Sequence, residues 1–545
     1  MAIGTLEEDD DRIAFSQDLP TLLLHNLRKF GDRTFLVDGI RDIKKTYKEV
    51  HDEAIVYALA LKKLGVRDGS YVACLTESHT NTYIFKIAVW LAGGCICPLN
   101  INLTPGEIST ILNISTSDTI YCSAEQLQRF EEKIRPIVSK PFKIITDNRH
   151  DQYPSLEVIR EELKLSQEEL STFSTTPYDP REHITYLLFT SGTTGVPKGV
   201  RLSSIASLLN GCRISIDKTP TFLTSPVYWI SNSAAFLNAI LEGTELISPG
   251  VKYLPGTEQE DLYHLLECIQ KYKPGKWQPG ISTIMDICLL PNVKKYDLSS
   301  LTHLAVGGSL ILPSQKKFVC DTLFGGRNII QERFGTTENG FLTRQWSFPP
   351  PDFNSPKYAS FGPPSPGVII KIVDDSGNEL GPHQVGEIVV KSNCTMKGYI
   401  NEELPEEYTP DDWYPLGDLG YYDEDGWFYF KARIKELIKY RGSQLMPADV
   451  EKVLLQHPDV VEVCVTGKPH PIDGEHPTAF VVKRANSSVS ESELIDFVAE
   501  RVDNSKKLRG GVFFAESLPK SGAGKLLRRN VKDSLVKMCA AINDV

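Results

Sequence analysis

Residues 184–199 read Ile-Thr-Tyr-Leu-Leu-Phe-Thr-Ser-Gly-Thr-Thr-Gly-Val-Pro-Lys-Gly, an apolar run followed directly by glycines and hydroxyl side chains. An apolar run of this length predicts a buried strand. Glycines let backbone N–H groups approach an anion closely, the hydroxyls add donors, and Lys198 adds a positive charge. The pattern therefore predicts a phosphate-binding loop. We assign to it Thr190, Ser191, Gly192, Thr193, Thr194, Gly195 and Lys198.

This loop differs from a Walker A loop. A Walker A loop requires Gly-x4-Gly-Lys-Ser/Thr, whereas here Gly199 follows the lysine. A flexible surface loop rich in glycine, serine and threonine is the alternative interpretation. Its position directly after a predicted buried strand favours phosphate binding.

The pattern of apolar residues divides the chain into regions. Strand-length apolar runs alternate with helical patterns from about Thr34 to Leu246, which predicts parallel sheets covered by helices. After Ser360, short strands and tight turns indicate a smaller β-rich subdomain. The C-terminal part is a separate α/β pattern with a capping box at Ser490 to Glu493. We predict an α/β fold with an N-terminal domain over residues 1–431 and a C-terminal domain over residues 432–545.

The composition is that of an ordinary soluble globular protein, with 41% hydrophobic and 24% charged residues. A formal net charge of −11 disfavours a nucleic-acid partner. The most apolar stretch, Ile87 to Leu99, contains a Gly-Gly pair and is too short to cross a bilayer. We therefore expect no transmembrane segment.

The 11 cysteines contain no Cys-x-x-Cys pair, which is typical of reduced thiols in the cytosol. The acidic N-terminal residues are unlike a secretory or mitochondrial presequence. The chain ends Asn543-Asp544-Val545, so the Ser-Lys-Leu peroxisomal signal is absent. We expect a cytoplasmic protein.

Further motifs carry chemistry suited to a nucleotide. Gly307-Gly308-Ser309 follows a predicted strand, where glycines permit a flat ring to lie against the backbone; a simple tight turn is the open alternative. Phe334-Gly335-Thr336-Thr337-Glu338 combines an aromatic ring, hydroxyls and a carboxylate suited to Mg²⁺. Asp418 can accept hydrogen bonds from two ribose hydroxyls, or form an ordinary surface ion pair with Arg433. Lys525 follows Gly522 and Gly524, which lets it project from a loop.

Together these motifs resemble, in order and over about Thr34 to Arg529, the adenylate-forming superfamily. That superfamily includes acyl-CoA synthetases, 4-coumarate ligases, beetle luciferases and peptide-synthetase adenylation domains. The resemblance implies a large N-terminal domain of two helix-covered sheets plus the β-rich subdomain, and a small mobile C-terminal domain. It also implies ATP, Mg²⁺ and coenzyme A as cofactors, and a small carboxylic acid as substrate.

The resemblance implies roles for single residues. Phe334 and the segment from Gly307 to Ser309 would hold adenine, and Asp418 with Arg433 would hold ribose. Thr337 would bind the α-phosphate and Glu338 the metal. The catalytic residues would be Lys525, Thr337, Glu338 and, after the C-terminal domain rotates, Lys439. Tyr228 and Trp229 would line the acyl pocket.

Several positions depart from the family pattern. Ala432 stands at the hinge, where Asp or Lys is usual, and Ser203-Ser204 replaces a histidine. Trp229 takes the place of the usual gate residue. Asn210 stands where a luciferase has arginine, and Gly340-Phe341 replaces a Thr-Ser pair.

These observations favour an AMP-forming acid–thiol ligase that makes an acyl-CoA from a medium- or long-chain fatty acid. Residues 506–511 resemble luciferase, which points to the insect branch of luciferase-like acyl-CoA synthetases. A luciferase-type monooxygenase, an aryl- or cinnamate-type CoA ligase and a non-catalytic nucleotide-binding relative are the alternatives. We expect a monomer or a weak dimer, and the resemblance leaves a peroxisomal location open.

Overall fold

The computed structural model describes residues 3–5, 18–77, 79–190, 197–214, 217–250, 259–308, 311–345, 350–400, 413–520 and 526–543. Of the predicted site residues, Ser191, Gly192, Thr193, Thr194, Gly195, Ser309 and Lys525 lie outside these ranges. The chain forms two compact units. One consists of Met1–Ile3, Ile370–Val390 and Tyr414–Val545, and the other of Gly4–Ile369 and Lys391–Trp413. The domain boundary between residues 431 and 432 stays a prediction.

The larger unit, residues 4–369 with 391–413, contains two sheets. The six-stranded sheet is parallel except for its edge pair β8–β9. Its strands in spatial order are β7 (Lys143–Thr146), β6 (Thr119–Cys122), β4 (Tyr71–Leu75), β5 (Cys95–Pro98), β8 (Ile184–Thr190) and β9 (Lys198–Ser203).

The eight-stranded sheet of this unit is also mainly parallel, with antiparallel pairs at its two edges. In spatial order it comprises β15 (Gly340–Arg344), β14 (Ile330–Thr336), β13 (His303–Gly307), β12 (Lys276–Gln278), β10 (Thr221–Leu223), β11 (Leu246–Ser248), β2 (Thr34–Asp38) and β3 (Ile43–Thr46).

Helices cover the sheets of the larger unit. A buried cluster packs α10 (Gln259–Tyr272), α11 (Ile281–Cys288) and α12 (Pro313–Leu323) on the eight-stranded sheet. A second cluster packs α4 (Pro105–Ile114) and α5 (Ala124–Arg129) on the six-stranded sheet. The remaining helices are α1 (Leu19–Phe30), α2 (Tyr47–Lys63), α3 (Thr80–Leu91), α6 (Leu156–Glu162), α7 (Gln167–Thr172), α8 (Ser204–Arg213) and α9 (Ile230–Glu242).

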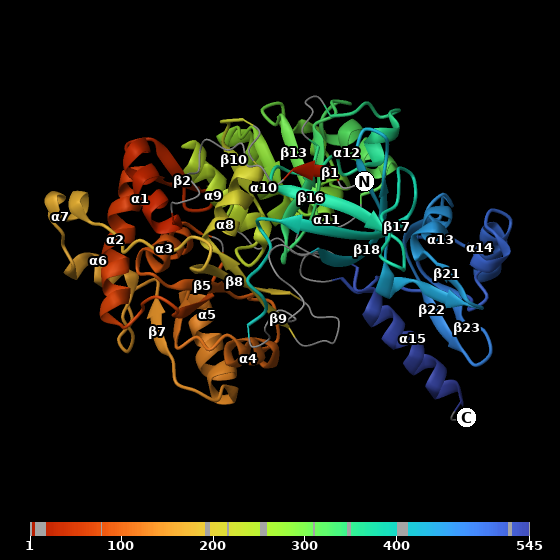
Figure 1. The fold of residues 1–545 in the computed structure, drawn as a ribbon, viewed down its shortest axis with the longest axis horizontal. Helices are drawn as coiled ribbons and strands as arrows, with labels where there is room; N and C mark the ends of the chain where they lie inside the picture. Colours follow the sequence, from red (N-terminus) through yellow and green to blue (C-terminus); the bar gives the residue numbers. More distant parts are fainter. Residues whose placement is uncertain are drawn as a thin grey trace. The chain divides into compact units, whose positions relative to one another are not determined.

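Buried aromatic rings join the two sheets through α3 and α9. Phe236 of α9 stacks on Phe35 of β2, with ring centroids 5.8 Å apart, and on Tyr83 of α3 at 5.0 Å. Trp90 of α3 meets the edge of Tyr186 of β8 at 5.1 Å. The ring contacts run from β2 through α9 and α3 to β8, so these two helices form a layer between the two sheets. Such aromatic pairs bury large apolar areas. Figure 1 shows α2 lying beside α3.

The smaller unit holds most of two five-stranded sheets. The first runs β1 (Ile3–Thr5), β16 (Val368–Val373), β17 (Gly386–Ser392), β18 (Tyr414–Tyr422) and β19 (Phe428–Arg433). The second runs β21 (Ser443–Leu445), β20 (Ile438–Tyr440), β23 (Gly474–Lys483) and β22 (Val460–His470), with β24 (Val512–Phe514) paired to β23.

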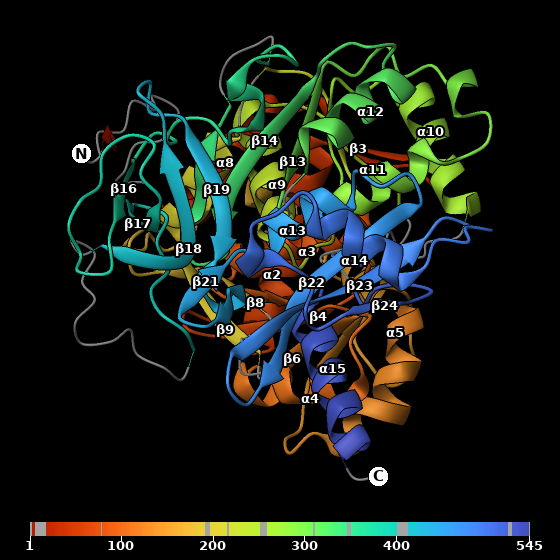
Figure 2. The same cartoon turned by 90° about the vertical axis from the view of Figure 1, so that its right-hand side faces the viewer.

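The second of these sheets is covered on both faces because its apolar side chains alternate. Val463 and Val465 belong to the cluster formed with α13 (Pro447–Leu454) and α14 (Glu491–Ala499). The intervening Cys464 packs with Val531 and Leu535 of α15 (Arg528–Asn543). A two-residue side-chain period places these sets on opposite faces. Figure 2 shows these helices and strands in blue.

The predicted α/β fold class is confirmed, with its large N-terminal part, β-rich strands and C-terminal α/β part. Ser490 caps α14 through the predicted capping box with Glu493. Among the described residues, no helix is both long and apolar enough to cross a membrane. Ten cysteines in the described part of the chain are buried and free of disulfides.

Candidate functional site

The predicted phosphate loop lies between two paired strands. β8 ends at Thr190 and β9 begins at Lys198, and these two residues are register partners in an antiparallel pair. Both ends of the loop are therefore fixed at one place on the edge of the six-stranded sheet. Gly199 packs so tightly that a Cβ there would lie 2.6 Å from Ile400.

Tyr399 connects the end of this loop to the predicted metal ligand. The Lys198 ammonium lies 4.6 Å from the centre of the Tyr399 ring, within cation–π range. The Tyr399 hydroxyl donates a hydrogen bond of 3.2 Å to Glu338 Oε1. Tyr399 itself is positioned by a bridge to Val200 of β9. Tyr399 could not be expected from the sequence, because nothing in its local sequence signals these long-range contacts.

Hydrogen bonds to the buried Asn339 hold the turn that carries Thr337 and Glu338. This turn joins β14 to β15, and the Thr336 hydroxyl accepts the backbone N–H of Asn339 at 3.1 Å. Asn339 is fully buried and accepts a hydrogen bond from Thr395 at 3.0 Å. The side chains of Thr337 and Glu338 remain half-exposed. This arrangement fixes the turn while leaving both side chains accessible to a ligand.

The residues predicted to bind adenine occupy the ends of neighbouring strands. Gly307 of β13 is the register partner of Arg333, directly before Phe334 of β14. A Cβ at Gly307 would lie 2.7 Å from the Arg333 carbonyl oxygen, so only glycine fits. Gly308 is exposed, and a Cβ there would meet nothing within 4 Å. The carboxyl ends of parallel strands are where α/β sheets bind ligands.

Gly335 allows the chain to fold sharply after Phe334. The register of β14 with β15 shifts at this point, and a Cβ at Gly335 would lie 2.3 Å from the Gly340 carbonyl oxygen. The Phe334 ring stays half-exposed, 5.5 Å from the ring of Phe361. The glycine therefore lets the turn approach β15 while the ring remains at the surface.

The two residues assigned to the acyl pocket stand at the start of α9. Trp229 is the N-cap, and its carbonyl oxygen accepts the backbone N–H groups of Asn232 and Ser233 at 3.1 and 3.2 Å. The rings of Tyr228 and Trp229 meet edge to face, with centroids 6.2 Å apart. Burial raises the pKa of Tyr228 to about 12, so its phenol stays protonated at neutral pH.

Asn210 of α8 forms a close-fitting pair with the glycine after the Glu338 turn. It is buried, and its Oδ1 accepts the backbone N–H of Phe341 at 3.1 Å. A Cβ at Gly340 would lie 2.2 Å from the Asn210 carboxamide oxygen, and Gly340 has a φ of +70°. Two of the departures from the luciferase pattern therefore pack against each other.

The smaller unit carries the residues predicted to bind ribose. Asp418 of β18 and Arg433 of β19 are register partners, and Arg433 Nε lies 3.5 Å from Asp418 Oδ1. Asp418 is buried, whereas 45% of the Arg433 side chain is exposed. Ala432 is buried in the same strand, opposite Leu419.

Lys439, predicted to act in the second half-reaction, lies on β20 with an exposed side chain. Its backbone N–H donates to Glu475 Oε2 at 2.9 Å. Arg441 and Gly442 follow with φ values of +47° and +79°. This segment is exposed and tightly turned.

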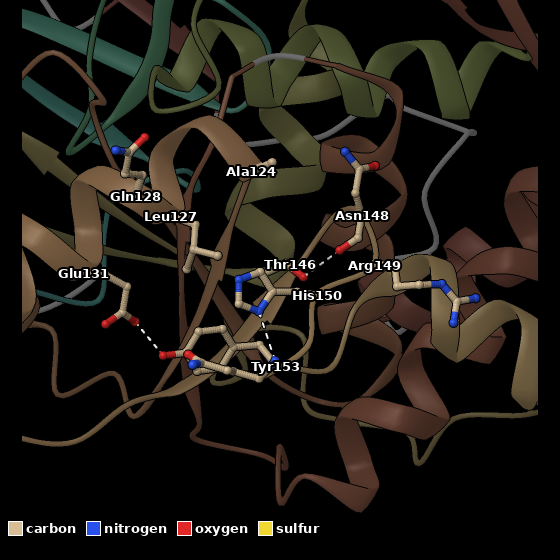
Figure 3. A pocket seen from close by; sticks show the side chains of 10 residues that line it. Ala124, Leu127, Gln128, Glu131, Thr146, Asn148, Arg149, His150 and Tyr153 are labelled. Carbon is tan, nitrogen blue, oxygen red and sulfur yellow. Dashed lines mark hydrogen bonds between the residues drawn. The ribbon is translucent and has the colours of Figure 1, made fainter.

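A pocket of about 380 Å³ lies elsewhere in the larger unit. Figure 3 shows it between α5 and residues 146–153, with the Tyr153 hydroxyl donating to Glu131 at 2.7 Å. None of the candidate residues that the structure describes lines it. Half of its lining residues are exposed polar side chains, and we do not assign the function to this pocket.

Comparison with known proteins defines the class. Residues 23–400 match the family model for AMP-binding enzymes, and residues 449–525 match the AMP-binding enzyme C-terminal domain. The chain therefore belongs to the AMP-binding enzymes of the adenylate-forming superfamily.

Individual relatives span nearly the whole chain. A probable 4-coumarate–CoA ligase 1 of Dictyostelium discoideum is 31% identical, covering 94% of this chain and 95% of its own. A luciferin 4-monooxygenase of Nipponoluciola cruciata is 29% identical, covering 94% of each. The anthranilate CoA ligase AuaEII, solved with anthranoyl-AMP, has a TM-score of 0.82 at 22% identity and covers 97% of this chain and 99% of its own.

Proposed function

We propose that the protein is an ATP-dependent acid–thiol ligase that converts a medium- or long-chain fatty acid into its acyl-adenylate and then its acyl-CoA. The observation that carries this proposal is the connection Lys198–Tyr399–Glu338, which brings the end of the phosphate loop beside a carboxylate. A cationic group and a metal-binding carboxylate at one place suit a triphosphate with its metal ion.

The residues of this region fit Mg²⁺ as well as ATP. Tyr399 donates to one oxygen of Glu338, and a carboxylate has acceptor positions beyond that single bond. Mg²⁺, when bound by Glu338 and the phosphates, would neutralise charge on the triphosphate. Thr337 is half-exposed in the same turn, and we assign to its hydroxyl a hydrogen bond to the α-phosphate.

In the first half-reaction, the substrate carboxylate attacks the α-phosphorus of ATP. A carboxylate oxygen–phosphorus bond forms, the bond from that phosphorus to the bridging oxygen breaks, and pyrophosphate leaves. Negative charge accumulates on the α-phosphoryl oxygens, so positive charge fixed there lowers the barrier. We assign this task to Lys525, and the neutralisation of the outer phosphates to Lys198.

In the second half-reaction, the coenzyme A thiolate attacks the acyl carbon and AMP leaves. We assign Lys439 to this step, in which the C-terminal domain presents a different face to the adenylate. Such a rotation lets one pocket serve two reactions while water is excluded. Asp418 and Arg433 would hold the ribose in the first step.

A fatty acid is the substrate class that we propose for the acyl pocket. Tyr228 and Trp229 offer aromatic surface at the start of α9. Asn210, which by the resemblance stands where a luciferase has arginine, packs against Gly340 and accepts from Phe341, and this departure argues against a luciferin pocket. The second candidate is a luciferase-type reaction, because the chain is similar to luciferin 4-monooxygenases. The third is a CoA ligase for an aryl acid, because the chain is similar to 4-coumarate–CoA ligases.

The test is pyrophosphate release from purified protein, Mg·ATP and carboxylic acids of graded chain length, with and without coenzyme A. We expect release that depends on a fatty acid, and acyl-CoA only when coenzyme A is present. Preference for cinnamic acids would move the assignment to an aryl ligase. Light emission with luciferin and oxygen would favour the monooxygenase, and ATP binding without pyrophosphate release would favour a non-catalytic relative.

A further inference from the structure

The hairpin formed by β22 and β23 carries two histidines and an aspartate, each three residues apart: His470, Asp473 and His476. β22 ends at His470 and pairs with Gly474, the first residue of β23. This hairpin folds the three side chains onto one another. One ring nitrogen of each histidine and one carboxylate oxygen all lie within 4.8 Å of each other.

The distances within this cluster are close to those around a metal ion. Asp473 Oδ2 lies 2.7 Å from His476 Nε2 and 3.6 Å from His470 Nδ1. Ligand atoms at tetrahedral zinc are separated by roughly 3.3 Å, given bonds of about 2.0–2.1 Å. The two observed distances lie on either side of this value. Coordination of one ion by all three groups therefore requires movements of about 1 Å in these distances and a rotation of the two stacked imidazole rings, so that a nitrogen of each points at the ion.

Neighbouring groups hold the cluster in this arrangement. Arg441 Nε donates to Asp473 Oδ1 at 2.7 Å, which leaves Oδ2 directed at both imidazoles. The imidazole rings stack with centroids 4.0 Å apart and an interplanar angle of 18°, which keeps them adjacent in the absence of an ion, and this stacking is given up when both rings coordinate. Hydrogen bonds to the second oxygen of a ligating carboxylate are a normal feature of metal sites.

Two features of the cluster lower the affinity that we expect. The Arg441 guanidinium places a positive charge near the ion, although its side chain is 65% exposed and so screened by water. His470 Nδ1 accepts the backbone N–H of Asp473 at 3.1 Å, and coordination through that nitrogen gives up this bond. Binding through His476 Nε2 requires the ring to carry its proton on Nδ1.

We propose that His470, Asp473 and His476 form a binding site for a divalent transition-metal ion, with Zn²⁺ as the physiological class of ion. Two imidazoles and one carboxylate are a donor set that zinc accepts readily, whereas Mg²⁺ prefers oxygen ligands alone. The His470 side chain is 34% exposed, so water can complete the coordination. This site is separate from the Mg²⁺ role of Glu338 and does not depend on the proposed ligase activity.

An ion at this site would stiffen the neighbouring β20 segment. The backbone N–H of Arg441 donates to the Asp473 carbonyl at 2.9 Å, and Tyr440 is the register partner of Gly474. Linking β22 to β23 through a metal would therefore restrain the turn against which residues 439–441 lie. Because a ligand that binds only the folded state stabilises it, Zn²⁺ is expected to raise the Tm of the full chain.

The test is calorimetric titration of the full-length protein with ZnCl₂ in a buffer that does not chelate metals. We expect one saturable site, and a loss of affinity of about 10- to 100-fold or more in His476→Ala and Asp473→Asn. The matched control is His383→Ala, since His383 is an exposed histidine paired with the single carboxylate of Glu424 at 2.8 Å. This control should bind Zn²⁺ as the unaltered protein does.

A second measurement covers the case in which a variant fails to fold. Acylation of histidines by diethyl pyrocarbonate, mapped by mass spectrometry, should be suppressed by Zn²⁺ at His470 and His476 of the unaltered protein, and not at His383. Equal modification of His470 and His476 with and without Zn²⁺ would overturn the proposal. Zn²⁺ affinity unchanged in a folded His476→Ala would also overturn it.

Discussion

The turn between β14 and β15 in the larger unit and the β20 segment in the smaller unit both carry candidate catalytic residues, yet they are held differently. Glu338 is followed in the turn by the buried Asn339, and its carboxylate accepts a hydrogen bond from the Tyr399 hydroxyl. Lys439 is exposed on a short strand, followed by residues with positive φ at Arg441 and Gly442. A carboxylate held in place by neighbouring contacts is suited to a ligand that stays bound throughout the reaction. An exposed lysine is suited to a surface that contacts the substrate in only one of the two half-reactions.

The largest effect that we predict falls on adenylation alone. Lys525→Ala should lower acyl-adenylate formation by about 100- to 1000-fold, because it removes the charge to which we assign the stabilisation of the transition state. Transfer of the acyl group from a preformed adenylate to coenzyme A should remain largely intact. Pyrophosphate release and acyl-CoA formation from synthetic adenylate measure the two steps separately.

The matched control for this variant is Lys520→Ala. Lys520 makes an ion pair of 2.7 Å with Glu462 in which both side chains are at least 30% exposed, so its loss should cost little. An equal loss of both half-reactions in Lys525→Ala would contradict the use of two faces of the C-terminal domain.

The sequence predicted the strands better than the contacts between distant segments. Tyr71–Leu75 lies in the region where strand-length apolar runs were predicted, and Val368–Val373 in the region after Ser360 where short strands were predicted. β23 begins at Gly474, ahead of its apolar part, because the long hairpin with β22 extends the pairing into polar residues. β9 was not predicted from the sequence. Its alternation of apolar and polar residues is weak, and its partner strand β8 lies on the other side of the phosphate loop in the sequence.

The candidate site could be predicted only where its signal is local. Glycines next to hydroxyls or a lysine marked residues 190–199, and the structure places the two strands that flank this loop. Tyr399 lies far along the chain from both Lys198 and Glu338, so only the fold reveals that it touches both. The His470–Asp473–His476 cluster likewise depends on a hairpin that brings its two ends together.

Glu338→Gln should have the second largest effect. The substitution keeps the side-chain size and the acceptor for Tyr399 but removes the charge that we propose to bind Mg²⁺. We expect pyrophosphate release to fall by about 100-fold at limiting Mg²⁺, with partial recovery as Mg²⁺ is raised. Glu182→Gln, at an exposed ion pair with Lys397, is the control. A loss that Mg²⁺ does not relieve would argue against a metal role.

Lys439→Ala should impair the second half-reaction and leave the first intact, the opposite of Lys525→Ala, and the loss of rate should be smaller. Thioester formation should fall about tenfold, the cost of one charged hydrogen bond, while pyrophosphate release in a single turnover stays unchanged. Lys452→Ala, which removes an exposed lysine of α13, is the control. Slower adenylation in Lys439→Ala would remove the contrast between the two regions.

Tyr399→Phe should have the smallest effect of the four. It removes the hydroxyl that donates to Glu338 and keeps the ring beside Lys198. We expect pyrophosphate release to fall by roughly two- to tenfold, the worth of one hydrogen bond. The control Tyr263→Phe removes a hydroxyl that donates to the Pro291 carbonyl at 2.9 Å. Equal activity of both variants would show that the connection through Tyr399 does not orient Glu338.

The central claim is that a carboxylate oxygen becomes bonded to the α-phosphorus of ATP. The most direct measurement uses a fatty acid with ¹⁸O in both carboxylate positions, together with Mg·ATP and coenzyme A, and determines the mass of the nucleotide product. The account predicts AMP that contains one ¹⁸O atom, released together with pyrophosphate. Unlabelled AMP, or ADP and phosphate in its place, would contradict it.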